Sequence, residues 1–142
     1  LKFNMGVLFS TSRRTPGWMA NLIKEKLGDF PGLDLLVIAN EDNPPCAAGG
    51  IMGLSKVLIL SPDSISMVSE AVDSKKKVFV FNVPGLNSKH LRFLNNLSMK
   101  KAVNLTDIND IDKRVSLALE NNAPFYTLTD RLSVKERLSK IL

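Results

Sequence analysis

The sequence is poor in the residues that form covalent staples, metal sites and base-stacking platforms. Its 142 residues include one cysteine, one histidine, one tryptophan and one tyrosine. A lone cysteine, Cys46, excludes a disulfide framework, and we see no cluster of metal ligands. One tryptophan and one tyrosine supply only a poor platform for stacking bases. We therefore do not expect nucleic acid as a partner. Intrinsic disorder is excluded as well, because 44% of the residues are hydrophobic.

Long hydrophobic runs are also missing. No apolar run approaches the roughly 18 residues of a membrane-spanning helix. Residues 1–9 lack the apolar centre and the small-residue cleavage site of a signal peptide. We therefore expect a cytoplasmic protein in a reducing compartment. Because the chain begins at Leu1, we also interpret it as part of a longer protein.

Positive charge is in excess, with 19 Lys and Arg against 14 Asp and Glu and a net charge of +5. An excess of this sign favours anionic partners such as nucleotides, phosphorylated sugars and acidic membrane surfaces. The cations are spread along the whole chain. The densest run, Lys75-Lys76-Lys77, is typical of a solvated turn.

Short apolar runs alternate with amphipathic stretches. The runs at residues 3–9, 33–39, 56–60 and 78–83 hardly alternate with polar residues, which predicts strands covered on both faces. Helical spacing follows at residues 16–27, 67–74 and 88–100, and again after Thr106. The resulting order, β-α-β-(short α)-β-α-β-α-(short β)-α, predicts an α/β fold: a Rossmann-like open parallel sheet with helices on both faces.

Local signals predict where these helices begin and which sides they bury. Thr15, Ser66 and Thr106 are the predicted N-caps, with Pro16 at the first helical position. The predicted core stripe of the first helix is Trp18, Leu22, Ile23 and Leu27, and that of the helix after Thr106 is Ile108, Ile111, Val115 and Leu119.

The chain changes character near its end. Pro124 ends one unit, and Ser133 with Glu136 forms a capping box for a last helix. We therefore predict one domain over residues 1–122 and a helical appendage over residues 123–142.

The first candidate site is the loop at residues 10–16, between a predicted strand and a predicted helix. Ligands of open α/β sheets bind beyond the carboxyl ends of the strands, where this loop lies. Ser12, Arg13, Arg14 and Thr15 supply hydroxyls and guanidiniums beside the free N–H groups of a helix start, which suits a phosphate. A capped helix with two solvated arginines is the alternative. The glycines of a Walker loop or a dinucleotide fingerprint are missing.

The second candidate site follows the third predicted strand. Ser64 precedes the predicted helix, and Ser66, Ser69 and Glu70 share one helical face. A carboxylate one turn into a helix can accept hydrogen bonds from two neighbouring sugar hydroxyls. Helix capping, with Glu70 near the positive end of the dipole, explains the same residues equally well.

Three further features are weaker. The loop around Asn43, with its two prolines, has a backbone that can read a base edge, although a plain connector accounts for it better. His90 has no carboxylate or nucleophile at a spacing that suggests a triad. Cys46 lacks a CxxC partner and an activating base, which favours a buried or idle thiol.

Two separated motifs together resemble the mitochondrial-fission ELM-type family. The first is Thr11-Ser12-Arg13-Arg14-Thr15-Pro16. The second is Asp63-Ser64-Ile65-Ser66-Met67-Val68-Ser69-Glu70-Ala71, followed by Lys77-Val78-Phe79-Val80-Phe81. Asn43-Pro44 is similar to the family's Asn-Pro-Tyr, although Pro45 replaces the aromatic. The likeness extends over roughly residues 5–105.

The resemblance implies a fold and a function. The family looks like a GT-B glycosyltransferase, and this chain resembles its C-terminal half, which holds a nucleotide-diphosphate sugar as donor substrate. Ser12, Arg13, Arg14 and Thr15 would then meet the diphosphate. Ser64, Ser66 and Ser69 would add phosphate and sugar contacts, and Glu70 would meet the ribose.

The same resemblance implies that the acceptor site and the catalytic base belong largely to an N-terminal domain that these residues do not include. We assign no catalytic residue, no metal and no resident cofactor. The alternative is a protein-interaction module without transferase activity, as the plant member of the family implies. Peripheral association with a membrane is a further expectation.

Overall fold

The protein is described by a computed structural model that covers residues 5–120 in interpretable detail. The chain divides into two compact units, Leu1–Ser55 and Lys56–Leu142, and each is described by itself. No helix in the described part of the chain is long and apolar enough to cross a membrane.

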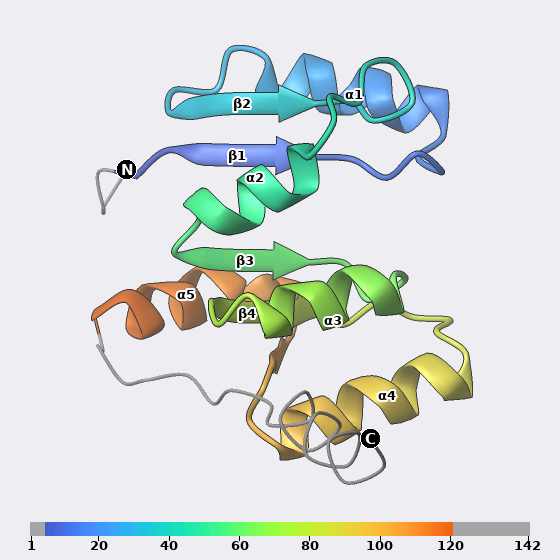
Figure 1. Cartoon of the computed structure of the whole chain (residues 1–142), viewed down its shortest axis with the longest axis vertical. Coiled ribbons are helices and arrows are strands. Elements are labelled where there is room, and N and C mark those ends of the chain that lie inside the picture. Colours follow the sequence, from blue (N-terminus) through green and yellow to red (C-terminus); the bar gives the residue numbers. More distant parts are fainter. Residues whose placement is uncertain (1–4, 121–142) are drawn as a thin grey trace, which may run out of the picture. The chain divides into compact units, whose positions relative to one another are not determined.

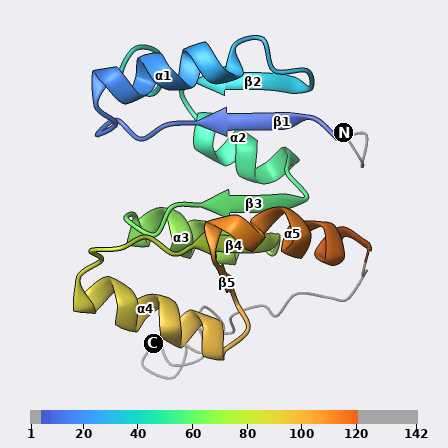
Figure 2. The same cartoon turned by 180° about the vertical axis from the view of Figure 1, so that it is seen from behind.

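The first unit is a pair of parallel strands with two helices. Strand β1 (Val7–Ser10) leads to α1 (Gly17–Leu27), and β2 (Leu33–Val37) leads to α2 (Ala47–Leu54). The strands pair in parallel, and their register shifts between Val7 and Leu8 of β1, which pair with Leu33 and Leu35 of β2. Figures 1 and 2 show α1 and α2 on opposite sides of the two strands. The carboxyl ends of both strands therefore open into the loops at residues 11–16 and 38–46.

The second unit is a three-stranded parallel sheet in the order β3-β4-β5. Its elements are β3 (Val57–Leu60), α3 (Ile65–Asp73), β4 (Lys77–Phe81), α4 (Ser88–Met99), β5 (Asn104–Thr106), the 3-10 turn η1 (Ile108–Asp110) and α5 (Ile111–Glu120). Figures 1 and 2 show α3 and α5 on opposite faces of β3 and β4. The central strand β4 supplies the core, because Val78, Phe79 and Val80 are all buried.

The predicted fold class and the predicted order of elements are confirmed. Every strand pair is parallel, helices flank both groups of strands, and a short helix does separate β2 from β3. The strands are hydrogen-bonded in two small sheets, one in each unit. Several strands are shorter than their apolar runs, because a strand ends where its ladder of hydrogen bonds ends rather than where hydrophobicity does.

The three predicted N-caps are wrong by one or two residues. Helix α1 begins after Pro16, whose side chain makes no capping bond, while Thr15 bonds to its own loop. Helix α3 begins two residues earlier than predicted, with Ser64 rather than Ser66 as its cap. After β5 the cap is Asp107, because Thr106 is buried as the last residue of the strand. The helix α3 and the turn η1 therefore take as cap the polar side chain at the point where the backbone leaves the extended conformation, whereas α1 has no side-chain cap.

The predicted core stripe of α1 is also partly wrong. Ala20 is fully buried, whereas Trp18 is 66% exposed and Leu22 is 44% exposed. Helical geometry places Trp18 and Leu22 on the side opposite Ala20, and Ile23 and Leu27 on the same side as Ala20. In the last turn before α5, Ile108 is likewise 53% exposed rather than part of the core.

The predicted appendage over residues 123–142, with its capping box of Ser133 and Glu136, lies outside the described residues. The boundary predicted near residue 122 lies just beyond them.

Candidate functional site

The loop between β1 and α1 is a closed turn built from its own hydroxyls. Thr15 donates its backbone N–H to the carbonyl of Ser12 at 2.9 Å, and the N–H of Ser12 donates to Oγ1 of Thr15 at 3.1 Å. The hydroxyl of Ser12 accepts the N–H of Arg14 at 3.2 Å. Ser12 and Thr15 therefore shape the turn, and their hydroxyls are already engaged within it.

The turn is fixed to the end of β2 by residues on both sides of it. Thr11 donates its N–H to the carbonyl of Val37 at 3.0 Å, and its Oγ1 accepts the N–H of Ala39 at 3.0 Å. The side-chain amide of Asn40 donates to the carbonyl of Thr15 at 3.2 Å. Neither Thr11 nor Asn40 was predicted to hold the two loops together, because these bonds join residues that are far apart in the sequence.

Arg13 and Arg14 extend from this turn into solvent. Both side chains are exposed, and neither forms an ion pair with any residue in the described part of the chain. Helix α1 begins just beyond them, and the N–H groups of Gly17 and Trp18 have no acceptor among the described residues. Two unpaired guanidiniums beside a helix N-terminus form a site suited to an anion of high charge.

The predicted residues of the second loop lie on the first turns of α3. Ser64 caps this helix by accepting the N–H of Met67 at 3.4 Å, and its hydroxyl lies 3.3 Å from that of Ser66. Ser69 donates its hydroxyl to the carbonyl of Ile65 at 2.8 Å. Ser66 and Ser69 are exposed, so their oxygens remain accessible as acceptors.

Glu70 lies on the same face of α3 as Ser66 and Ser69, as helical spacing predicts. Its side chain is exposed, and no salt bridge involves it within residues 5–120. Its carboxylate is thus available to accept hydrogen bonds from a hydroxylated ligand.

His90 joins two loops at the carboxyl end of the second sheet. Asn87 caps α4, and its Oδ1 accepts both the backbone N–H of His90 at 2.9 Å and the ring Nδ1 at 2.8 Å. The other ring nitrogen, Nε2, lies 3.2 Å from the carbonyl of Asp63. Both ring nitrogens thus face acceptors, and a neutral imidazole carries only one N–H. His90 is therefore engaged in holding these two loops together.

The predicted site residues fall into two groups that belong to different units. Ser12, Arg13, Arg14 and Thr15 form the turn in the unit Leu1–Ser55. Ser64, Ser66, Ser69 and Glu70 lie at the start of α3 in the unit Lys56–Leu142. Within each unit the residues lie together at the carboxyl end of a parallel strand, which is where α/β folds bind ligands.

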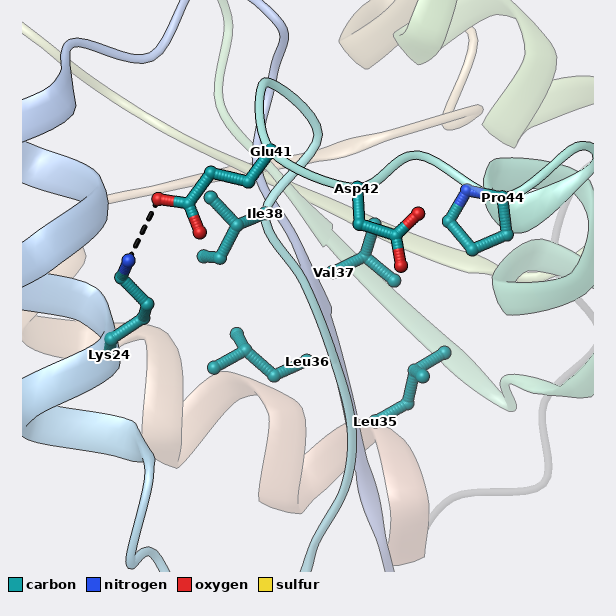
Figure 3. Close-up of a pocket in the computed structure, with 8 residues that line it drawn as sticks. All are labelled: Lys24, Leu35, Leu36, Val37, Ile38, Glu41, Asp42 and Pro44. Atoms are coloured by element: carbon teal, nitrogen blue, oxygen red, sulfur yellow. Dashed lines mark hydrogen bonds and ion pairs between the residues drawn. The ribbon is translucent and has the colours of Figure 1, made fainter.

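The first unit also contains a pocket of about 310 Å³ that none of the predicted residues lines. Figure 3 shows it with Lys24 of α1 on one side and the loop after β2 on the other. Lys24 and Glu41 form an ion pair at 2.7 Å across it, and residues 35–38 form an apolar floor. Glu41, Asp42 and Pro44 of the loop after β2 line this pocket.

Of the two alternatives expected for Cys46, a buried or an idle thiol, the structure excludes the buried one. Cys46 is exposed and precedes α2 with a positive φ of 67°. Within residues 5–120, no three side chains of His, Cys, Asp or Glu gather as a metal site would require.

Taken together, the parallel strands, the flanking helices and the anion-suited turn define a Rossmann-like α/β protein. The model of one family, mitochondrial fission ELM1, matches residues 2–128. The chain therefore belongs to the mitochondrial fission ELM1 family. Searches of curated proteins and of solved structures found no match.

Proposed function

We propose that this chain holds the diphosphate of a nucleotide-diphosphate sugar, as one half of a GT-B-like glycosyltransferase. The observation that carries the proposal is the turn after β1. Arg13 and Arg14 leave it unpaired among the described residues, directly before the N-terminus of α1. A pyrophosphate would satisfy both guanidiniums and the open N–H groups of Gly17 and Trp18.

The second group of residues would bind the hydroxyl groups of a sugar. Ser64 and Ser66 offer hydroxyls at the start of α3, and Glu70 offers an exposed carboxylate one turn further on. A carboxylate accepts hydrogen bonds from two adjacent ribose hydroxyls.

The chemistry that such a site performs is stabilisation of a leaving group. When the bond between sugar and diphosphate breaks, negative charge grows on the departing phosphate oxygen. Preorganised guanidiniums and helix N–H groups stabilise this charge more strongly than they stabilise the bound donor, and this lowers the barrier. The acceptor and the base that activates it would come from a domain beyond these 142 residues.

The double variant Arg13→Ala/Arg14→Ala tests this proposal. A hydrogen bond to a charged group contributes about 1.5–3 kcal/mol, so losing two should weaken the binding of uridine diphosphate by about a hundredfold or more. Binding is measured by thermal shift across a panel of nucleoside diphosphates and by titration calorimetry. Ligand at 100 times its dissociation constant should stabilise the parent chain by about 2.7 kcal/mol.

The matched control is Lys75→Ala/Lys101→Ala, which removes two cations that precede the amino ends of β4 and β5. This variant should bind the nucleotide as the parent does. The proposal fails if no nucleoside diphosphate or nucleotide sugar stabilises the parent chain, or if both double variants lose binding equally.

An interaction module without transferase activity is the second candidate, and one observation favours it. Trp18 and Leu22 form an exposed apolar face on α1, opposite the buried Ala20. Such a face suits a partner protein better than it suits water. If no nucleotide binds, substitution of Trp18 by Ala becomes the informative variant for partner binding.

A further inference from the structure

All three strands of the second unit are entered through lysines. Lys56 directly precedes β3, Lys75-Lys76-Lys77 leads into β4, and Lys100-Lys101 precedes β5. The strand register places the amino ends of the three strands close together. Val57 of β3 pairs with Lys77 of β4, and Asn104 of β5 pairs with Phe79, which lies two residues after Lys77. Neighbouring strands lie about 4.8 Å apart, so these turns are adjacent. We call this group the lysine edge: Lys56, Lys75, Lys76, Lys77, Lys100 and Lys101.

The charge at this edge is strongly one-sided. No Asp or Glu occurs between Asp73 and Asp107, although that span holds most of the unit's described cations. Among the described residues of this unit, Asp73 at the end of α3 and Glu120 at the end of α5 bring carboxylates to this side of the sheet. Figure 1 shows α3 and α5 both ending at the side where β3 begins. Six lysines thus face two carboxylates.

Three of the lysines present their charge freely. Lys56, Lys75 and Lys101 are exposed, and none forms an ion pair with another described residue. Lys77, in contrast, donates to the carbonyl of Ala118 and so holds α5 against β4.

Two of these free lysines occupy positions where the backbone favours glycine. Lys75 has φ of 61° and Lys101 has φ of 57°, each directly after the end of a helix. Glycine is the usual residue at such a position because it has no Cβ to clash. A cation does interact favourably with a helix C-terminus. The left-handed conformation, however, brings the Cβ of any residue with a side chain too close to the following carbonyl oxygen. A lysine therefore stands in place of the usual glycine in two neighbouring turns.

We propose that the lysine edge docks the protein on an anionic lipid surface. Lysine is a compact, hydrated point charge without the planar fork that arginine uses to recognise single phosphates or carboxylates, so it suits a diffuse layer of headgroups. Met99, 75% exposed at the end of α4 and next to Lys100, adds an apolar side chain that can enter the headgroup layer. A nucleic acid is disfavoured, because the edge has neither arginine nor an aromatic ring for stacking.

This inference is independent of the proposed nucleotide site. The lysine edge lies at the amino ends of β3, β4 and β5, whereas Ser64, Ser66 and Glu70 follow the carboxyl end of β3. Lipid binding at one end of the strands therefore leaves the other end accessible.

The test is co-sedimentation of the 142-residue chain with vesicles. One set contains phosphatidylcholine alone, and the other contains about 30% phosphatidylglycerol, an anionic lipid. We expect binding to the anionic vesicles only, with loss of binding when the salt concentration is raised from about 0.1 M to 0.5 M. The variant Lys75→Gly/Lys101→Gly should weaken partitioning about 25-fold, at about fivefold for each lysine.

The choice of glycine separates charge from folding. Because glycine suits both backbone positions, this variant should melt at or above the temperature of the parent. The matched control Lys113→Ala/Arg114→Ala removes two exposed cations from the first turn of α5, away from the lysine edge, and should bind vesicles as the parent does.

Three results would overturn the proposal. The first is no binding to anionic vesicles at low salt. The second is an equal loss in the α5 control, which would reduce the effect to net charge. The third is binding of a soluble acidic polypeptide, poly-L-glutamate, at the lysine edge without any binding of the vesicles.

Discussion

Lys101 is a residue with a side chain at a backbone position that favours glycine. It follows α4 in the left-handed region, and its N–H donates to the carbonyl of Ser98 at 2.9 Å while Ala102 donates to Leu97 at 2.9 Å. This pair of bonds is the Schellman arrangement, in which the left-handed position is usually glycine. Arg13 and Arg14 are the opposite case: an ordered turn carries them, but nothing in the described part of the chain engages their charge.

At this scale we predict that Lys101→Gly stabilises the protein. The left-handed conformation costs a residue with a Cβ about 1–2 kcal/mol, and the extra entropy of glycine in the unfolded chain offsets about 0.5–1 of it. The free energy of unfolding should rise by about 0.5 to 1 kcal/mol, as measured by urea denaturation. Lys113→Gly in α5 should instead lower it by about 1 kcal/mol, because that position is helical. A destabilised Lys101→Gly variant would contradict the assigned strain.

At the scale of elements, capping decides where the helices start. The side chain of Asn87 accepts two bonds at the start of α4, from the backbone and the ring of His90. The same ring reaches the carbonyl of Asp63, so the cap of one helix also positions the loop that leads into another.

We therefore predict that Asn87→Ala destabilises the protein by about 1 kcal/mol, the usual contribution of an N-cap. Thermal unfolding measures the effect. Ser88→Ala is the control, because Ser88 is already helical and its replacement should change stability by less than about 0.5 kcal/mol. Equal effects of the two substitutions would show that Asn87 is not the cap that matters.

At the scale of the whole molecule, parallel strands separate two kinds of chemistry. Every strand runs from an amino end to a carboxyl end in the same direction as its neighbour. In the second unit, lysines collect at the amino ends and hydroxyls, His90 and Glu70 follow the carboxyl ends. The two ends of these strands therefore differ in their charge and in the side chains that they present.

We predict that the 142-residue chain binds a nucleoside diphosphate but does not turn over a nucleotide sugar. Arginines on one side of a donor stabilise the leaving phosphate, but no described residue is placed to activate an acceptor. Chromatography of a nucleotide sugar incubated with the chain should show no released nucleotide above the level without protein. Turnover that disappears in Arg13→Ala/Arg14→Ala would contradict this prediction.

Much of the fold could be predicted from the sequence, but less of the site. The apolar runs predicted parallel strands, and helical spacing predicted the helices between them, including the short α2. The caps were misplaced because Thr15, Ser66 and Thr106 are all chemically suitable, and only the path of the backbone selects their neighbours. Trp18 was predicted to be buried because its spacing fits an apolar stripe of α1. The helix instead buries the side that carries Ala20, which leaves Trp18 exposed.

What the sequence by itself determined is the order and type of the elements, because hydrophobic periodicity is local and each element carries its own pattern. The tertiary structure alone decided which residues from distant segments are neighbours. Parallel pairing brings the amino ends of β3, β4 and β5, and with them Lys56, Lys77 and Lys101, close together. Hydrogen bonds between loops join Thr15 to Asn40 and His90 to Asp63. The physical reason is that strand register and loop contacts depend on groups far apart in the chain, which no local spacing records.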